Sequence, residues 1–281
     1  MLEKKEMIVA PGAYDALTAK VVEHLGFKAA YMGGWITGAH LCVTEPLMTL
    51  TEQVANASWV TRVLKVPLIV DADAGFGDAV HTFRAVQEFE RAGVAAIHIE
   101  DQVFPKRAHY HKGVEHVIPI EEFIAKLKSA LAARTDKDFL IIARTDGRNA
   151  VGGSLDEAIR RAKACADIGV DLIKPMLYGR PIEEMKAFRK AVPNIPLAEL
   201  SGVGNNFSVK QLADIGYQMV IYQLTSIISA VDGVMKVYSE LKETGKTTFP
   251  EARGNQVRTT IEELIGLPGY YKIEEVTTEA S

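Results

Sequence analysis

The chain has 281 residues, of which 48% are hydrophobic and 24% charged, and its formal net charge is −4. This composition is typical of globular proteins, and the lack of a lysine- and arginine-rich run argues against nucleic acid as a partner. Two cysteines are too few for a disulfide framework, and no apolar stretch reaches the roughly 18 residues of a membrane span, so we expect a soluble cytoplasmic protein.

Short apolar runs alternate with amphipathic helical patterns through most of the chain. Strands are predicted over residues 7–10, 29–32, 68–71, 95–100, 140–145, 172–175, 197–200 and 219–222. Helices are predicted over residues 14–25, 51–64, 80–92, 120–134, 154–168 and 182–192. Eight strands separated by helices favour an α/β fold with a single parallel (β/α)8 barrel, which we place at residues 1–245. Residues 246–281 change character and predict a C-terminal helical extension with a tail.

The third predicted strand ends in two acids one residue apart, Asp71 and Asp73, followed by a turn that contains Gly75 and Gly77. Carboxylates are costly to desolvate without a partner, so a buried strand gains nothing by ending in two of them. At an open strand end they can hold a cation, and hard oxygen ligands suit Mg2+ or Mn2+. On its own, this short pattern fits equally well an acidic loop that follows a core strand.

Acidic and basic residues also end the next two strands. Glu100 closes the fourth strand and Arg144 closes the fifth. Because the active sites of parallel barrels lie at the carboxyl ends of the strands, we expect these residues to gather with the acid pair. Asp71, Asp73 and Glu100 are therefore the predicted metal ligands, and Arg144 is the predicted anion clamp.

Other strand ends supply candidate substrate contacts. The second strand holds Tyr31 and ends at Gly33 and Gly34, whose amides a carboxylate can approach closely because no side chain obstructs them. Trp35 follows, and Glu199 ends the seventh strand. We predict that these five residues contact the substrate together with Asp71 and Arg144, although Trp35 fits a packing role equally well.

Several segments resemble the isocitrate lyase/phosphoenolpyruvate mutase superfamily across roughly residues 8 to 245. They read PGAYDALTAK, DADAGFG, IHIEDQVFPKR, IIARTD and IGYQMVIY. The resemblance implies a barrel whose last helix is exchanged between subunits, usually in a homotetramer. It also implies Mg2+ coordinated, partly through water, by Asp71, Asp73 and Glu100, with Arg144 on the substrate carboxylate. The family's shared theme is the enolate of a 2-oxo acid held on that ion.

The chain departs from this family in the loop that follows the fourth strand. The isocitrate and methylisocitrate lyases carry Lys-Lys/Arg-Cys-Gly-His there, with the cysteine as the acid. This chain has Ala108 in the cysteine's place, which cannot exchange a proton. His109 is the first candidate replacement, followed by Tyr110 and His111, because histidine titrates near neutral pH. An exposed loop whose histidines merely face solvent is the alternative. Lys106 keeps the family's positive charge and is expected to close over an anionic substrate.

These features predict a Mg2+-dependent lyase that cleaves a C–C bond in a small 2-hydroxy- or 2-oxo-carboxylate. A substituted malate, a methylisocitrate-like compound or an oxaloacetate-like compound would fit. A phosphonopyruvate-type mutase or hydrolase is the first alternative, weakened because the Lys-Thr/Val-Asn-Ser loop of those enzymes is missing. A catalytically silent barrel that binds an oxo acid is the second.

Overall fold

The computed structural model describes residues 6–203 and 207–278. Eight parallel strands run through these residues and form the predicted α/β barrel. The strands are β1 (Ile8–Pro11), β2 (Ala30–Met32), β3 (Leu68–Asp71), β4 (Ala96–Glu100), β5 (Leu140–Arg144), β6 (Leu172–Lys174), β7 (Ala198–Leu200) and β8 (Met219–Tyr222). Each predicted strand is confirmed, with ends that differ by no more than one or two residues.

The strands close on one another in sequence order. One continuous sheet contains β2, β3, β4, β5 and β6, hydrogen-bonded in that order. A second sheet contains β1, β8 and β7, also in that order. Parallel bridges between Gly12 and Tyr31, and between Ile173 and Leu197, connect the two sheets on both sides. The carboxyl ends of all eight strands therefore meet at one end of the barrel.

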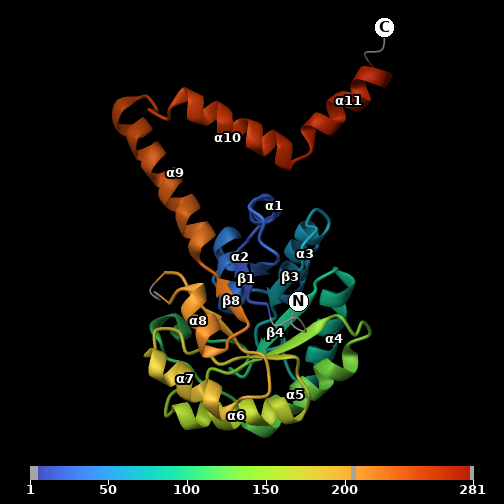
Figure 1. Ribbon diagram of the computed structural model, residues 1–281, viewed down its shortest axis with the longest axis vertical. Coiled ribbons are helices and arrows are strands. Elements are labelled where there is room, and N and C mark those ends of the chain that lie inside the picture. The colour runs from blue at the N-terminus through green and yellow to red at the C-terminus, as the bar shows by residue number, and fades with distance from the viewer. Residues whose placement is uncertain (1–5, 204–206, 279–281) are drawn as a thin grey trace. The chain divides into compact units, whose positions relative to one another are not determined.

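Helices follow the strands and lie outside them, as α4 to α7 do in Figure 1. The helices of the barrel are α1 (Ala16–His24), α2 (Gly34–His40), α3 (Leu50–Thr61), α4 (Ala79–Arg91), α5 (Ile120–Ala133), α6 (Leu155–Asp167), α7 (Ile182–Ala191) and α8 (Val209–Ile215). Local sequence sets several of their starts. Asp15 and Thr49 form capping boxes at α1 and α3, and the Ser154 hydroxyl accepts from the Glu157 amide at the start of α6.

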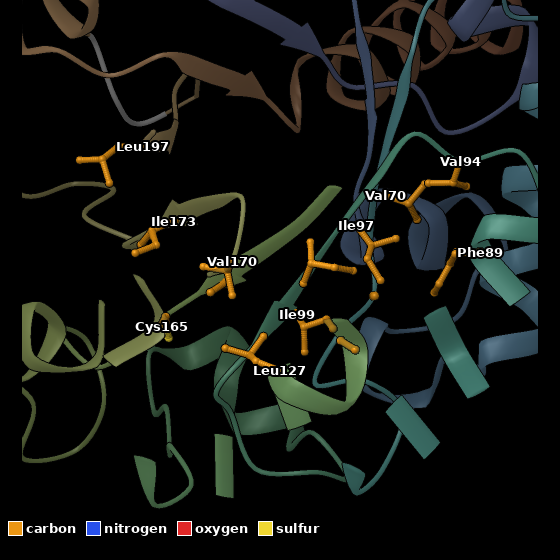
Figure 2. Packing of buried hydrophobic residues seen from close by; sticks show 14 of the residues in the cluster. Val70, Phe89, Val94, Ile97, Ile99, Leu127, Cys165, Val170, Ile173 and Leu197 are labelled. Carbon is orange, nitrogen blue, oxygen red and sulfur yellow. The ribbon is translucent and has the colours of Figure 1, made fainter. Parts of the chain in front are cut away.

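Side-chain alternation along the strands divides the core into two layers. Val70, Ile97, Ile99 and Ile173 face outward and pack with helix residues such as Leu127 (Figure 2). Alternate positions point into the barrel and form a smaller apolar layer. That inward layer consists of Ile8, Ala10, Ala29, Tyr31, Ile69, Ala96, Ile142, Leu172, Ala198, Met219 and Ile221. Inward positions nearer the carboxyl ends of the strands are polar, and they build the site described below.

The chain divides into two compact units, Met1–Ser226 and Ile227–Ser281. The second unit contains most of α9 (Thr225–Thr244), together with α10 (Glu251–Leu264) and α11 (Leu267–Thr277). Among the described helices, none combines the length and the apolar character needed to cross a membrane.

Candidate active site

The acid pair after β3 is buried and partly held by backbone amides. Asp71 accepts from the amide of Gly34 at 3.2 Å and from the amide of Asp73 at 2.9 Å. Asp73 has a left-handed φ of 50° and is 8% exposed. Burial raises the pKa of Asp73, whereas the positive groups around Asp71 outweigh burial and lower its pKa. The two neighbouring acids therefore lie in different electrostatic environments.

Glu100 lies between two cations at the end of β4. One carboxylate oxygen is 2.8 Å from Lys106 Nζ and the other is 2.7 Å from Arg144 Nη1. Neither oxygen makes a hydrogen bond of good geometry despite these short approaches. Lys106 also pairs with Glu45 at 2.7 Å, so this lysine bridges two buried carboxylates. Burial raises the pKa of Glu100 well above its usual value, even though both cations oppose the shift.

Arg144 is anchored on several sides. Its Nε and Nη2 donate to the two carboxylate oxygens of Asp146, each at 2.9 Å, while Nη1 approaches Glu100. The Tyr110 hydroxyl lies 3.4 Å from Nη2. Asp146 is itself fixed through its backbone amide, which donates to Asp101. The guanidinium plane is thus oriented before any ligand arrives.

Below these ion pairs, Tyr31 and His98 form a hydrogen-bonded pair inside the barrel. The Tyr31 hydroxyl is 2.7 Å from His98 Nε2, and Lys174 Nζ is 3.4 Å from the same nitrogen. His98 Nε2 is also 3.6 Å from Asp71 Oδ2. Burial lowers the pKa of His98 well below its usual value and lowers the pKa of Lys174 to about 8. These contacts connect the floor of the site to the acid pair.

The loop after β4 folds its 3-10 turn, η3 (Ala108–Lys112), over the site. Lys106 Nζ lies 4.4 Å from the ring centroid of Tyr110, which adds a cation–π contact to its ion pairs. His111 Nε2 is 3.1 Å from the Thr44 hydroxyl. His109 is exposed. Lys106 is therefore a buried part of the site and not a freely moving cation above it.

A cavity of about 520 Å3 opens beside this loop. Among the predicted residues, Trp35, Tyr110 and His111 line it, and His109 does not. Glu199 does not line it either. The Glu199 carboxylate accepts from the amides of Leu177 at 3.0 Å and Leu200 at 2.9 Å, in the direction of the helices.

The structure thus brings together most of the predicted residues around one cluster of charges. It joins Gly34, Asp71, Asp73, Glu100, Lys106, Tyr110 and Arg144 through the contacts above, with Gly33 next to Tyr31. Sequence reasoning left out Lys174, Glu115 and Arg180, of which the last two line the cavity. Lys174 ends an apolar strand, which is the same signal that identified Arg144. Glu115 and Arg180 lie in loops and carry no comparable signal.

The charge balance of the cluster suits a divalent cation. Five buried carboxylates interact electrostatically with only three buried cations, a formal excess of two negative charges when all of them are ionised. The carboxylates are Glu45, Asp71, Asp73, Glu100 and Asp146, and the cations are Lys106, Arg144 and Lys174. In residues 6–203 and 207–278, no three acid, histidine or cysteine side chains are close enough to enclose an ion unaided. Mg2+ usually keeps several waters and needs only one or two carboxylates, so the residues present fit it.

Glu115 gives a test of the electrostatics around the cavity. Burial, followed by the charge of Asp146, raises its pKa from 4.5 to about 7. Folding therefore favours the neutral acid, and ionised Glu115 lowers stability as the pH rises from about 4.5 to above 7. We expect Glu115→Gln to raise the free energy of unfolding by about 1–2 kcal/mol at pH 8 and to change it little at pH 4.5. Thermal unfolding at the two pH values measures this difference.

The same substitution at Glu121, an exposed residue of α5, is the matched control. Its effect on the melting temperature should be the same at both pH values. An unchanged or negative shift for Glu115→Gln at pH 8 would contradict the environment described for Glu115.

Comparison with known proteins places these features in context. Residues 1–242 match the family model described as phosphoenolpyruvate phosphomutase. The chain is 40% identical over 280 residues to 2,3-dimethylmalate lyase of Eubacterium barkeri, with 98% of this chain and 94% of the relative covered. It is 37% identical to 2-methylisocitrate lyase of Aeropyrum pernix, with 100% and 90% covered.

Solved structures with similar sequences also share the fold of this chain. Oxaloacetate acetylhydrolase in complex with 3,3-difluorooxalacetate superimposes with a TM-score of 0.87 at 28% identity, covering 96% of this chain and 92% of the other. Phosphonopyruvate hydrolase in complex with oxalate and Mg2+ superimposes with a TM-score of 0.88 at 29% identity, covering 99% and 96%.

Proposed function

The chain belongs to the phosphoenolpyruvate phosphomutase family, within the isocitrate lyase/phosphoenolpyruvate mutase superfamily, and from that premise we propose that it is a Mg2+-dependent C–C lyase. Its substrate would be a 2-hydroxy- or 2-oxo-carboxylate, such as a substituted malate, a methylisocitrate-like acid or an oxaloacetate-like acid. The observation that carries the proposal is the buried cluster of Asp71, Asp73, Glu100 and Arg144 at the carboxyl ends of three neighbouring strands.

In this proposal Asp71, Asp73 and Glu100 would hold the ion, partly through water. The ion would supply charge neutralisation next to a carbonyl oxygen, which lowers the cost of breaking the adjacent bond. Arg144 would orient the substrate carboxylate, because Asp146 already fixes its guanidinium plane. The buried positive charge of Lys106 would further stabilise an anion in a region from which water is excluded.

Ala108 stands at the position of the lyases' acidic cysteine, so another residue must exchange the proton with the substrate. Tyr110 is the best-placed member of the predicted set because it lines the cavity and approaches Arg144. Burial raises its pKa, so its hydroxyl is protonated at neutral pH and can donate. Both histidines are exposed, but only His111 lines the cavity. This geometry supports Tyr110 and His111 ahead of His109, and the predicted substrate contact of Glu199 stays a prediction.

An assay panel tests the proposed function directly. Substituted malates, methylisocitrate and oxaloacetate would be incubated with the protein and Mg2+, with chromatographic detection of the oxo-acid and monocarboxylate products. We expect turnover of at least one of these acids and its loss when EDTA removes the metal. If none is consumed while oxalate still binds with Mg2+, the silent oxo-acid-binding barrel becomes the better description.

A C–P bond reaction remains the second candidate, favoured by the similarity to phosphonopyruvate hydrolase along almost the whole chain. Phosphonopyruvate belongs in the same panel, with 31P NMR to detect released phosphate or a rearranged product. Turnover of this compound alone would replace the C–C lyase assignment.

The second unit supports a proposal about assembly. Its helices expose large apolar side chains, including Val231, Met235 and Tyr238 on α9 and Tyr270 and Ile273 on α11. Apolar surface of this extent usually marks an interface. We propose a cytoplasmic homotetramer in which the last helix of the barrel is exchanged between subunits, and light scattering in solution tests its mass. A monomeric mass at micromolar concentration would argue against it.

A further inference from the structure

Among the described residues that line the cavity, Arg180 is the one arginine or lysine. It lies in the loop between β6 and α7, next to Pro181, the residue that precedes the first turn of α7. Its backbone amide donates to the carbonyl of Leu177 at 3.0 Å, and Gly179 supplies a left-handed φ of 73° in the same turn. The loop thus presents a half-buried guanidinium to the cavity from a defined turn.

This guanidinium is oriented by a neutral group. Nε and Nη2 of Arg180 both donate to Oδ1 of Asn149, at 3.0 and 2.5 Å. Asn149 is fixed in turn because its Nδ2 donates to the carbonyl of Met176 at 2.8 Å. In residues 6–203 and 207–278, Arg180 makes no ion pair, and Glu184, which pairs with Arg148, acts on Arg180 only from beyond ion-pair distance. An amide acceptor holds the side chain in place without cancelling its charge.

The neighbouring Arg148 shows the contrasting arrangement. Its Nε and Nη2 pair with the two carboxylate oxygens of Glu184 at 2.6 and 2.9 Å, and it does not line the cavity. Two arginines from adjacent loops thus have different surroundings. Arg148 pairs with a carboxylate outside the cavity, whereas Arg180 makes no ion pair and lines the cavity.

The same cavity adjoins the predicted carboxylate clamp, although Arg144 itself does not line it. Tyr110 lines it, and the Tyr110 hydroxyl is 3.4 Å from Nη2 of Arg144. Tyr110 therefore connects the clamp at Arg144 with the cavity that Arg180 also lines. Arg180 offers an oriented cation without an ion pair to this cavity, which Glu115 also lines.

We propose that Arg180 determines specificity by pairing with a second anionic group, carboxylate or phosphonate, on the substrate portion that lies away from Arg144. This inference rests on the proposed function, which places the oxo-acid end at Arg144 and the metal. It gives Arg180 a contact with the departing portion of the substrate. Charge-assisted hydrogen bonds of arginine to a planar anion supply both affinity and direction.

Calorimetric titration with Mg2+ present tests the inference with matched ligands. 2-Oxoglutarate is compared with 2-oxobutyrate, and 2-oxoadipate with 2-oxovalerate, since each pair differs only by the distal carboxylate. Phosphonopyruvate is compared with pyruvate in the same way. We expect the wild type to bind at least one dianion about tenfold or more tightly than its partner. Arg180→Gln should reduce that ratio to near one, and Arg180→Lys should restore part of it.

Oxalate, which has no distal arm, separates this inference from the proposed function. Its affinity should be the same in the wild type and in Arg180→Gln, which a general loosening of the loops would not allow. If the wild type fails to bind oxalate with Mg2+, the proposed function fails and the inference fails with it. If oxalate binds but the dianion preference is absent or survives in Arg180→Gln, only the role of Arg180 is overturned. The ligand pair in which the preference depends on Arg180 shows whether the second anionic group is a carboxylate or a phosphonate.

Discussion

Replacing Lys106 by methionine is expected to lower the free energy of unfolding by about 3–5 kcal/mol at neutral pH. Lys106 Nζ lies 2.7 Å from Glu45 and 2.8 Å from Glu100, and all three side chains are buried. Methionine keeps most of the volume but leaves both carboxylates without this cation. The loss is large because it strands buried charges, since removing one partner of a buried ion pair costs far more than the pair itself contributes.

Urea denaturation at pH 7.5 without Mg2+ measures the effect, with Lys128→Met as the control on an exposed lysine of α5. The control should change stability by no more than about 0.5 kcal/mol. Glu45→Gln in the Lys106→Met background should recover part of the loss, because one stranded charge is then removed. A change below about 1 kcal/mol for Lys106→Met would mean that the two carboxylates do not depend on Lys106 for compensation.

The gathering of acidic and basic strand ends could be predicted because strand ends are visible in sequence. Asp71, Glu100 and Arg144 each end an apolar run, and a parallel barrel gathers such ends by construction. The pairing register of neighbouring strands then decides which of these side chains point into the barrel together. Glu100 pairs with Arg144 and Arg144 pairs with Lys174, so the side chains of these three point inward together.

The face of the strand on which Glu199 lies could not be predicted from its position at a strand end. It pairs with Val220, whose side chain belongs to the outer apolar layer, while Ala198 faces inward. A shift of one residue reverses the face of a strand, and the parity of β7 is not fixed by its short apolar sequence. Glu199 therefore turns toward the amides of Leu177 and Leu200.

The contacts between residues of different loops also could not be predicted from the sequence. Lys106 was expected to close over a substrate, but it is buried between two carboxylates, one of which lies 61 positions earlier in the chain. Arg180 and Glu115 reach the cavity because loops after different strands converge, as the bridge between Glu115 and Ala150 shows. No local pattern encodes such encounters, because they depend on how separate loops pack.

Arg144→Lys is expected to lower kcat/KM by about a hundredfold or more while leaving the protein folded. Lysine keeps the positive charge near Glu100 and Asp146, so the electrostatic cost to stability is limited. It cannot reproduce the planar fork that donates through Nε and Nη2 to Asp146 while Nη1 faces Glu100. The substrate carboxylate then loses its fixed direction, and misplacement of the reacting group by about 1 Å costs roughly a hundredfold or more.

The comparison of kcat/KM with the melting temperature separates catalysis from folding for this variant. The substrate is the acid that the panel identifies, and oxalate binding with Mg2+ provides a readout that needs no turnover. Arg148→Lys is the control, because that arginine makes an equally bidentate pair with Glu184 outside the cavity. It should keep kcat/KM within about threefold of the wild type. If Arg144→Lys retains most of its activity, the positive charge at this strand end is sufficient, and the oriented fork is not what holds the carboxylate.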